Sequence, residues 1–227
     1  LAVQWFADLL ALGYSPETLR SRQTDLWRFL TFARAADLVE VSQIQAPEVL
    51  AYRRWMQGLG TLGIKSQRDS LQHLRHLLKW AQRRGLVQSL PEDELRLLRT
   101  GQRLPRHVMR LDEVERVLST PDTRTRSGLR DRVILEVFYS TGIRRKELIG
   151  LRVDDIQMER GLLLVREGKG RKDRYVPIGQ RALTWLRAYL ERVRVHWTGP
   201  NDRGALFLSA KGAPITVKTL GTVVGGY

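Results

Sequence analysis

The sequence predicts a mainly α-helical protein with a small β-sheet, divided into two domains. Apolar residues recur at three- and four-residue spacing along most of the chain, which is the period of an amphipathic helix. Two short apolar runs late in the sequence are bounded by glycine and charged turn residues, as in a β-hairpin. Residues 99–107 contain no acid and no apolar periodicity, and 227 residues suffice for one domain on each side of such a linker.

Residues 1–98 predict a compact helical domain. Ser15 can cap the free N–H groups at a helix start, and Pro16 fits the first helical position. Leu19, Leu26 and Phe29 then recur at helical spacing. Glycines after the later apolar runs mark where helices end. We expect helices over about Pro16–Ala35, Pro47–Gln57, Ser66–Arg84 and Pro91–Leu98.

Residues 108–227 predict a second domain of helices around a small sheet. The acids that follow Leu111 fit the first turn of a helix, because they complement the positive end of the helix dipole. A later helical run is interrupted at Thr141-Gly142, and a new helix follows. We expect helices beginning at Leu111 and Thr216 and over Gly128–Ser140 and Gln180–Trp197, with strands over Gly161–Val165, Arg174–Ile178 and Leu206–Leu208.

Composition narrows the classes of partner and site. A net charge of +15 and a pI near 10.9 favour a polyanionic partner, most plausibly nucleic acid. The chain has no cysteine and its four histidines are scattered, so we expect no disulfide, metal or other cofactor. No apolar run is long enough to span a membrane, and Leu1–Leu12 lacks a basic leader. We therefore expect a soluble, cytoplasmic protein.

Three consecutive cations begin the helix that follows Gly142. Arg144, Arg145 and Lys146 lie where the helix dipole is positive, which is unfavourable unless an external anion lies against them. The turn E-G-K-G-R-K-D between the two predicted strands adds Lys169, Arg171 and Lys172. Both segments are therefore predicted to face an anion.

A basic stripe runs along the helix expected over Ser66–Arg84. Its members fall at i, i+4, i+7, i+11 and i+15, opposite the leucines, and are Arg68, Gln72, Arg75, Lys79 and Arg83. Two interpretations stay open, an ordinary solvated face and a DNA-binding face. We interpret His73 and His76 on this helix as ordinary surface residues, because no nucleophile or partner base is spaced around them.

The run G-L-R-D-R-V-I-L-E-V-F-Y-S-T-G-I-R-R-K-E-L-I-G-L-R-V-D-D-I, followed by L-L-V-R-E-G-K-G-R-K-D-R-Y-V-P-I, closely resembles the tyrosine recombinases of the phage-integrase and Xer type. The combination of T-G-x-R-x-x-E-L with G-K-G-x-K-x-R is specific to them. The resemblance implies a SAM-like helical core-binding domain over residues 1–98, a basic linker over 99–107, and the N-terminal part of an α+β catalytic domain over 108–227.

Catalytic roles follow from the resemblance position by position. The family's first catalytic arginine falls on Arg144 and its hairpin lysine on Lys169, a general acid for the leaving 5′-oxygen. Glu147 lies i+3 from Arg144 on the same helix face and is expected to hold an arginine in place. We expect DNA contacts from Arg68, Arg75, Lys79, Arg145, Arg171, Lys172 and Arg174.

The sequence departs from the family pattern after the hairpin. No His-x-x-Arg cluster follows, and Tyr227 is the only tyrosine beyond Tyr189. We interpret Tyr227 as an aromatic on a packing helix rather than as the nucleophile. The expectation is that the chain stops before the second half of its active site and is inactive alone.

Two functions remain open at this stage. The first is a site-specific recombinase that cuts and rejoins DNA through a 3′-phosphotyrosine. The second is a catalytically incomplete DNA-binding protein that occupies recombination sites or modulates a recombinase. A topoisomerase of the same chemistry is disfavoured by the helical core-binding domain. The implied partners are double-stranded DNA and three further subunits, either identical or a paired recombinase, with no membrane.

Overall fold

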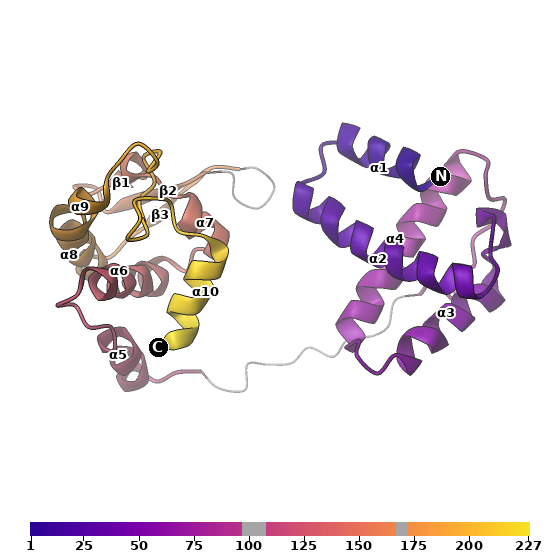
Figure 1. Cartoon of the computed structure of the whole chain (residues 1–227), viewed down its shortest axis with the longest axis horizontal. Helices are drawn as coiled ribbons and strands as arrows, with labels where there is room; N and C mark the ends of the chain where they lie inside the picture. The colour runs from indigo at the N-terminus through magenta and orange to yellow at the C-terminus, as the bar shows by residue number, and fades with distance from the viewer. Residues whose placement is uncertain (97–107, 167–171) are drawn as a thin grey trace. The chain divides into compact units, whose positions relative to one another are not determined.

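A computed structural model describes residues 1–96, 108–166 and 172–227 and divides the chain into two compact units, Leu1–Leu104 and Pro105–Tyr227. The expected linker over residues 99–107 lies outside the described residues, as do Lys169 and Arg171. Helices predominate in both units, and one three-stranded sheet lies in the second (Figure 1). The prediction of a mainly α protein with a small sheet is confirmed. No helix among the described residues is both long and apolar enough to cross a bilayer.

The first unit packs four α-helices around two apolar clusters. Helix α2 lies against α4, and α1 and α3 pack beside α2 (Figure 1). One cluster contains Phe29, Tyr52 and Leu71, and the other joins Trp5 of α1 to Leu77 of α4. The elements are α1 (Ala2–Ala11), α2 (Pro16–Ala35), η1 (Val41–Gln43), α3 (Ala46–Gly58) and α4 (Ile64–Arg83).

The predicted start of α2 is confirmed. The side chain of Ser15 accepts a hydrogen bond from the Thr18 N–H at 3.3 Å, and Pro16 is the first helical residue. Helix α1 was not predicted, although Trp5 and Leu9 are spaced i, i+4 and are both buried. Ten residues give few helical turns from which a period can be recognised.

The helix expected over Pro91–Leu98 is wrong for its described part. Residues 92–95 form one hydrogen-bonded turn, in which the Leu95 N–H donates to the Pro91 carbonyl at 3.0 Å. Leu95 is the one fully buried apolar residue of this turn, and so short a helix is marginal without more packing. Arg53 also binds the Glu94 carbonyl, at 2.9 Å, which removes an acceptor from any continuing helix.

The second unit surrounds the central helix α6 with helices and the sheet. Val133, Ile134 and Val137 of α6 are completely buried in a single apolar core. Helix α6 packs on α8 and on β3, and α10 packs on α7 (Figure 1). The helices are α5 (Leu111–Ser119), α6 (Arg126–Thr141), α7 (Arg145–Gly150), α8 (Gln180–Tyr189), the π-turn η3 (Leu190–Arg194), α9 (Val195–Trp197) and α10 (Val217–Gly226), with a short 3₁₀ turn η2 (Val153–Asp155).

The sheet is antiparallel in the order β1-β2-β3. Its strands are β1 (Ile156–Gln157), β2 (Leu162–Val165) and β3 (Arg174–Pro177). The register pairs Leu163 with Val176 and Val165 with Arg174, which confirms the predicted hairpin. Strand β1 was not predicted, because two residues carry no usable alternation.

The strand expected over Leu206–Leu208 is wrong. These residues are buried, but their backbone groups bind several separate partners instead of one neighbouring strand. The Leu206 N–H donates to the Leu151 carbonyl at 2.8 Å, and the Leu208 N–H donates to the Tyr189 hydroxyl at 3.1 Å. A buried apolar run therefore has its hydrogen bonds satisfied without a ladder.

Candidate functional site

Arg144 is placed by the break between α6 and α7. The last turn of α6 ends at Gly142, whose φ of +61° lies in the left-handed region that glycine tolerates best. Its N–H still donates to the Phe138 carbonyl at 2.9 Å, which closes the helix. Ile143 is buried behind the break and anchors it. Arg144 therefore stands immediately before the first residue of α7.

Glu147 binds two arginines that are far apart in sequence. Its carboxylate accepts the Arg144 backbone N–H at 2.8 Å and the Arg144 guanidinium at 3.0 Å. It also accepts two hydrogen bonds from Arg174 of β3, at 3.0 and 2.8 Å. This paired geometry is the strong form of an arginine–carboxylate contact. We call these three residues the arginine–glutamate cluster.

The electrostatics of the cluster keep Glu147 ionised. Its side chain is only 6% exposed, and burial alone would raise the pKa. Hydrogen bonds from Arg174, the largest effect, and then from Arg144 outweigh burial and lower the pKa of Glu147 to about 2. The same contact raises the pKa of Arg174. A carboxylate held in this state is a poor proton acceptor near neutral pH and a good anchor for cations.

The cluster leaves Arg144 open to solvent. Its side chain is 62% exposed, against 39% for Arg174. A guanidinium presents a planar set of donors that matches two phosphate oxygens and stays charged. Arg145, the first residue of α7, is exposed beside it. The arrangement can bind an external anion at Arg144 while Glu147 fixes the base of the side chain.

The predicted residues of the hairpin are only partly described. Lys169 and Arg171 lie outside the described residues, and Lys172 is exposed. Arg174, which we expected as a DNA contact, is engaged by Glu147. The sequence analysis missed this pair because the two residues are 27 positions apart, which no local periodicity connects.

The basic stripe on α4 is partly neutralised. Arg75 donates to Glu92 at 2.6 Å, and the Lys79 ammonium lies 3.6 Å from the same carboxylate. These contacts lower the pKa of Glu92, with Arg75 the main cause. Arg68 is half-buried and has an interaction of its own. Part of the positive charge of this stripe is therefore compensated by Glu92, and the stripe is not fully exposed to solvent.

The interpretation of the two histidines as surface residues is wrong. His73 Nδ1 lies 2.7 Å from Asp25 Oδ2, in a half-buried contact that joins α4 to α2. His76 is also half-buried, and its Nδ1 has no hydrogen-bond partner among the described residues. Sequence spacing identified their helix but not the polar residues on the neighbouring helix that bury them.

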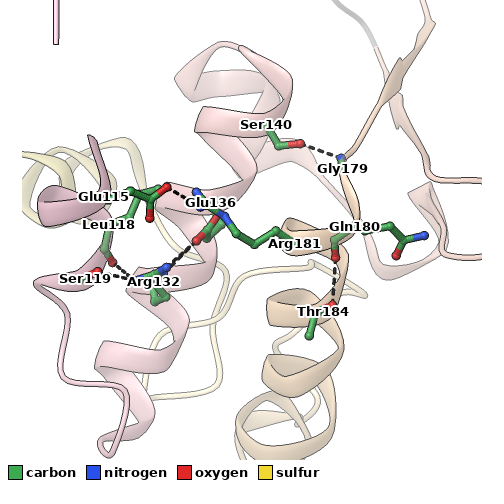
Figure 2. Close-up of polar contacts among 10 residues, drawn as sticks. All are labelled: Glu115, Leu118, Ser119, Arg132, Glu136, Ser140, Gly179, Gln180, Arg181 and Thr184. Carbon is green, nitrogen blue, oxygen red and sulfur yellow. Dashed lines mark hydrogen bonds and ion pairs between the residues drawn. The ribbon is translucent and has the colours of Figure 1, made fainter. Parts of the chain in front are cut away.

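A second network of charges joins three helices of the second unit (Figure 2). Glu136 of α6 is 1% exposed and accepts hydrogen bonds from Arg132 at 2.7 Å and from Arg181 of α8 at 2.9 Å. Arg181 also binds Glu115 of α5, and Arg132 donates to the Leu118 carbonyl near the end of that helix. This network joins α5, α6 and α8 in the unit that also carries the arginine–glutamate cluster.

The end of the described chain carries Tyr227. Helix α10 packs through Leu220 and Val223, as expected, but Tyr227 is 38% exposed and is not part of the core. Its hydroxyl donates to Asp131 Oδ2 at 3.2 Å, and Asp131 also binds Arg130 at 2.7 Å. Tyr227 follows the last residue of α10 and is therefore an exposed aromatic at the end of a packing helix.

The described residues contain no group of three metal-binding side chains.

A sequence profile of the phage integrase family matches residues 107–226. The chain is 38% identical to tyrosine recombinase XerC 2 of Ralstonia nicotianae, over 98% of this chain and 65% of the relative. It is 34% identical to XerC of Pelobacter propionicus, over 94% of this chain and 68% of the relative. The chain therefore spans about two thirds of the length of these curated relatives.

The fold is also shared with solved integrase structures. The integrase of transposon Tn1549, solved with circular intermediate DNA, superimposes with a TM-score of 0.74 at 17% identity. The superposition covers 98% of this chain and 76% of that one. At this level of identity the likeness concerns the fold, and it extends over both compact units of the chain.

Proposed function

The chain belongs to the phage integrase family, as a tyrosine recombinase of Xer type, and from that premise we propose that it serves site-specific DNA recombination. In the proposed reaction, a tyrosine hydroxyl attacks a backbone phosphorus of DNA. The new bond is a 3′-phosphotyrosine, the broken bond is the one to the 5′-oxygen, and that oxygen leaves as a hydroxyl after it gains a proton. Attack of a 5′-hydroxyl on the phosphotyrosine reverses the step and rejoins the strand.

Arg144 is the residue that we propose meets the scissile phosphate. The observation that carries this assignment is the arginine–glutamate cluster, in which Glu147 fixes the base of an exposed guanidinium. In the five-coordinate transition state, negative charge grows on the nonbridging oxygens. A guanidinium held in place stabilises that charge without moving when the reaction occurs. Arg174 contributes by neutralising Glu147, so that the carboxylate does not repel the phosphate.

Protonation of the leaving 5′-oxygen is assigned to Lys169. This assignment follows from its place in the hairpin motif, and a general acid at that point contributes about 10² to 10⁴ in rate. Lys172 stands three positions later and is the alternative donor. Arg145, Lys172 and the cations of α4 are proposed to contact the DNA backbone.

We also propose how the two units bind DNA and how many subunits act together. The first unit would act as the core-binding domain and the second as the catalytic domain, both on one duplex. Exchange of strands between two DNA sites requires four active subunits, so we propose a tetramer, of identical or paired subunits, acting on cytoplasmic DNA.

The test is the rate of DNA cleavage by the complete gene product with Arg144→Ala. At saturating DNA, formation of the covalent protein–DNA complex should slow by at least about 10² to 10³, the cost of one lost charge-stabilising donor. Affinity for the duplex should change little, because one exposed phosphate contact is a small share of the total. Gel separation of the covalent complex measures the first quantity and fluorescence anisotropy the second.

Arg145→Ala is the matched control, since it removes the neighbouring exposed cation of the same helix. It should weaken binding slightly and leave the cleavage rate at saturating DNA near that of the parent. Equal loss of affinity and cleavage in Arg144→Ala would instead assign Arg144 a structural role. Absence of any covalent complex in the parent protein would favour the catalytically incomplete DNA-binding protein.

A further inference from the structure

A cavity of about 350 Å³ lies in the first unit and is lined by residues of α1, α2 and α4 and of the segments that flank them. Its volume is at the lower end of the range for pockets that hold small ligands, about 300 to 1,000 Å³. Among its lining side chains are Trp5 of α1, Arg22 of α2, and His76 and Lys79 of α4. It is remote in sequence from the arginine–glutamate cluster. Of its lining residues, Lys79 belongs to the α4 cations that are proposed to contact the DNA backbone.

Arg22 is the unusual member of this cavity. It is 6% exposed, and its guanidinium carbon lies 4.4 Å from the centre of the Tyr14 ring and 5.7 Å from that of Trp5. Its Nε has no hydrogen-bond partner among the described residues, and no described carboxylate forms an ion pair with it. Ring contacts compensate a buried cation only in part. A buried charge without a counterion is costly, and a bound anion would lower that cost.

The acids of the cavity do not supply that counterion. Asp8 accepts hydrogen bonds from Trp80 and Arg84, and Glu92 accepts one from Arg75 and lies near Lys79. These two carboxylates pair with Arg84 and Arg75, which are not among the lining residues. Within the lining, three cations (Arg22, Lys79 and Arg83) therefore exceed two carboxylates (Asp8 and Glu92) by one positive charge.

His76 adds a second polar atom without a partner. Its Nδ1 is buried and makes no hydrogen bond to a described residue. Burial, followed by the charge of Arg22, lowers the pKa of His76, with smaller effects from His73, Arg75 and Lys79. The neighbouring charges that lower the pKa of this imidazole are cationic, and an added anion would oppose their effect.

We propose that this cavity binds a phosphate group, held by Arg22 and Lys79 with His76 beside it. A tetrahedral dianion or monoester accepts donors from several directions, which matches cations that come from both α2 and α4. The group can come from two sources, a phosphate of the DNA backbone or a free phosphate compound. The proposal concerns residues 1–96 alone, and it stands whether or not the second unit cleaves DNA.

The experiment compares the unfolding midpoint of the chain in phosphate and in chloride at equal ionic strength and pH 7. A ligand that binds only the folded state raises the midpoint with concentration. The midpoint of the parent chain should rise as inorganic phosphate is added. Arg22→Met should abolish that rise, while in chloride its own midpoint should equal or exceed that of the parent, because a buried charge without a counterion has been removed.

Lys79→Gln serves as a second variant that does not disturb the core, since its side chain is 44% exposed. It should shift the phosphate response to higher concentration. Lys65→Gln makes the same charge change at an exposed position of α4 outside the cavity lining and should respond like the parent. NMR of the His76 imidazole gives a local readout, and its pKa should rise when phosphate is bound.

Binding to a short duplex distinguishes the two sources. If the site holds a DNA phosphate, Arg22→Met weakens duplex binding and lowers the salt slope by about one. If duplex binding is unchanged and phosphate still raises the midpoint, the source is a free phosphate compound. The proposal is overturned if phosphate has no effect beyond chloride and Arg22→Met binds the duplex as the parent does.

Discussion

At the scale of single residues, Glu147 organises the candidate site. Its contact with Arg144 could be predicted from the i, i+3 spacing, although Arg144 is the residue before α7 and the contact is a capping box rather than a pair on one helix face. Its contact with Arg174 could not, since it depends on how β3 returns beside α7. Arg22 was missed for a similar reason. Its burial comes from rings on other segments, Trp5 and Tyr14, and no pattern within α2 reveals them.

The low pKa of Glu147 predicts a dependence of stability on pH. The folded pKa of about 2 lies below the ordinary value of 4.5, so the ionised carboxylate stabilises the fold fully above about pH 4.5. That contribution is lost as the pH falls toward 2. We expect Glu147→Gln to lower the free energy of unfolding at pH 7 by about 1 to 3 kcal/mol, allowing for the exposure of the arginines. Denaturant unfolding at pH 7, 4 and 2.5 would show the deficit shrinking.

Glu159→Gln is a control for this measurement, because Glu159 is exposed in the turn before β2. Its effect should stay within about 0.5 kcal/mol at every pH. A deficit for Glu147→Gln that is the same at pH 7 and pH 2.5 would show that lost packing, rather than the charge, causes it.

At the scale of elements, α5, α6 and α8 are joined through one buried acid. Glu136 of α6 lies between Arg132 and Arg181, and the latter also reaches Glu115 (Figure 2). The side chain of Glu136 is almost inaccessible to water, whereas that of Glu115 is 43% exposed. The two acids bind the same arginine at very different depths, so they separate the energetics of buried and surface ion pairs.

We expect Glu136→Gln to lower the free energy of unfolding of the second unit by about 2 to 4 kcal/mol. The change leaves Arg132 without its counterion in a buried position, and breaking such a pair is expensive. Glu115→Gln breaks a surface pair and should cost about 0 to 1 kcal/mol. Urea unfolding, followed by a probe in the second unit, measures both. Similar losses for the two variants would show that Glu136 is well solvated.

The sequence predicted well the long elements, in which apolar residues recur at a regular spacing. Helices α2, α4 and α6 and the β2–β3 hairpin each have many apolar contacts that repeat in register. The wrong predictions of elements concern short segments, because Leu206–Leu208 and Pro91–Leu98 are too short for a period to be measured. In such segments individual tertiary hydrogen bonds, such as that from Arg53 to Glu94, decide the backbone.

At the scale of the whole molecule, a net charge of +15 dominates what the chain can bind. The distribution of this charge over the two units and the excess of arginine could be predicted from the sequence. The pairing of those arginines could not, because most partners lie on another element. Arg75, Arg174 and Arg181 each contact a carboxylate, so the count of 39 Lys and Arg residues overstates how many cations are available to DNA.

Affinity for duplex DNA should therefore fall steeply with salt, with a slope set by the unpaired cations. A protein that contacts six to ten phosphates loses about 10³ to 10⁵ in affinity between 50 and 200 mM salt. We expect the slope for this chain to lie at or below the lower end of that range. Fluorescence anisotropy over a salt series measures it, and a flat dependence would rule out binding through the phosphate backbone.

The sharing of Glu147 between two arginines has a consequence for the proposed reaction. A phosphate bound at Arg144 would use the same guanidinium that Glu147 contacts, and the Glu147 carboxylate is almost fully buried. With Arg144 as its only partner, Glu147 would lose part of the charge compensation that its burial requires. Arg174 keeps both of its hydrogen bonds to the same group and acts as a reserve counterion. In the proposed reaction, Arg144 could therefore share its donors with a phosphate at little electrostatic cost.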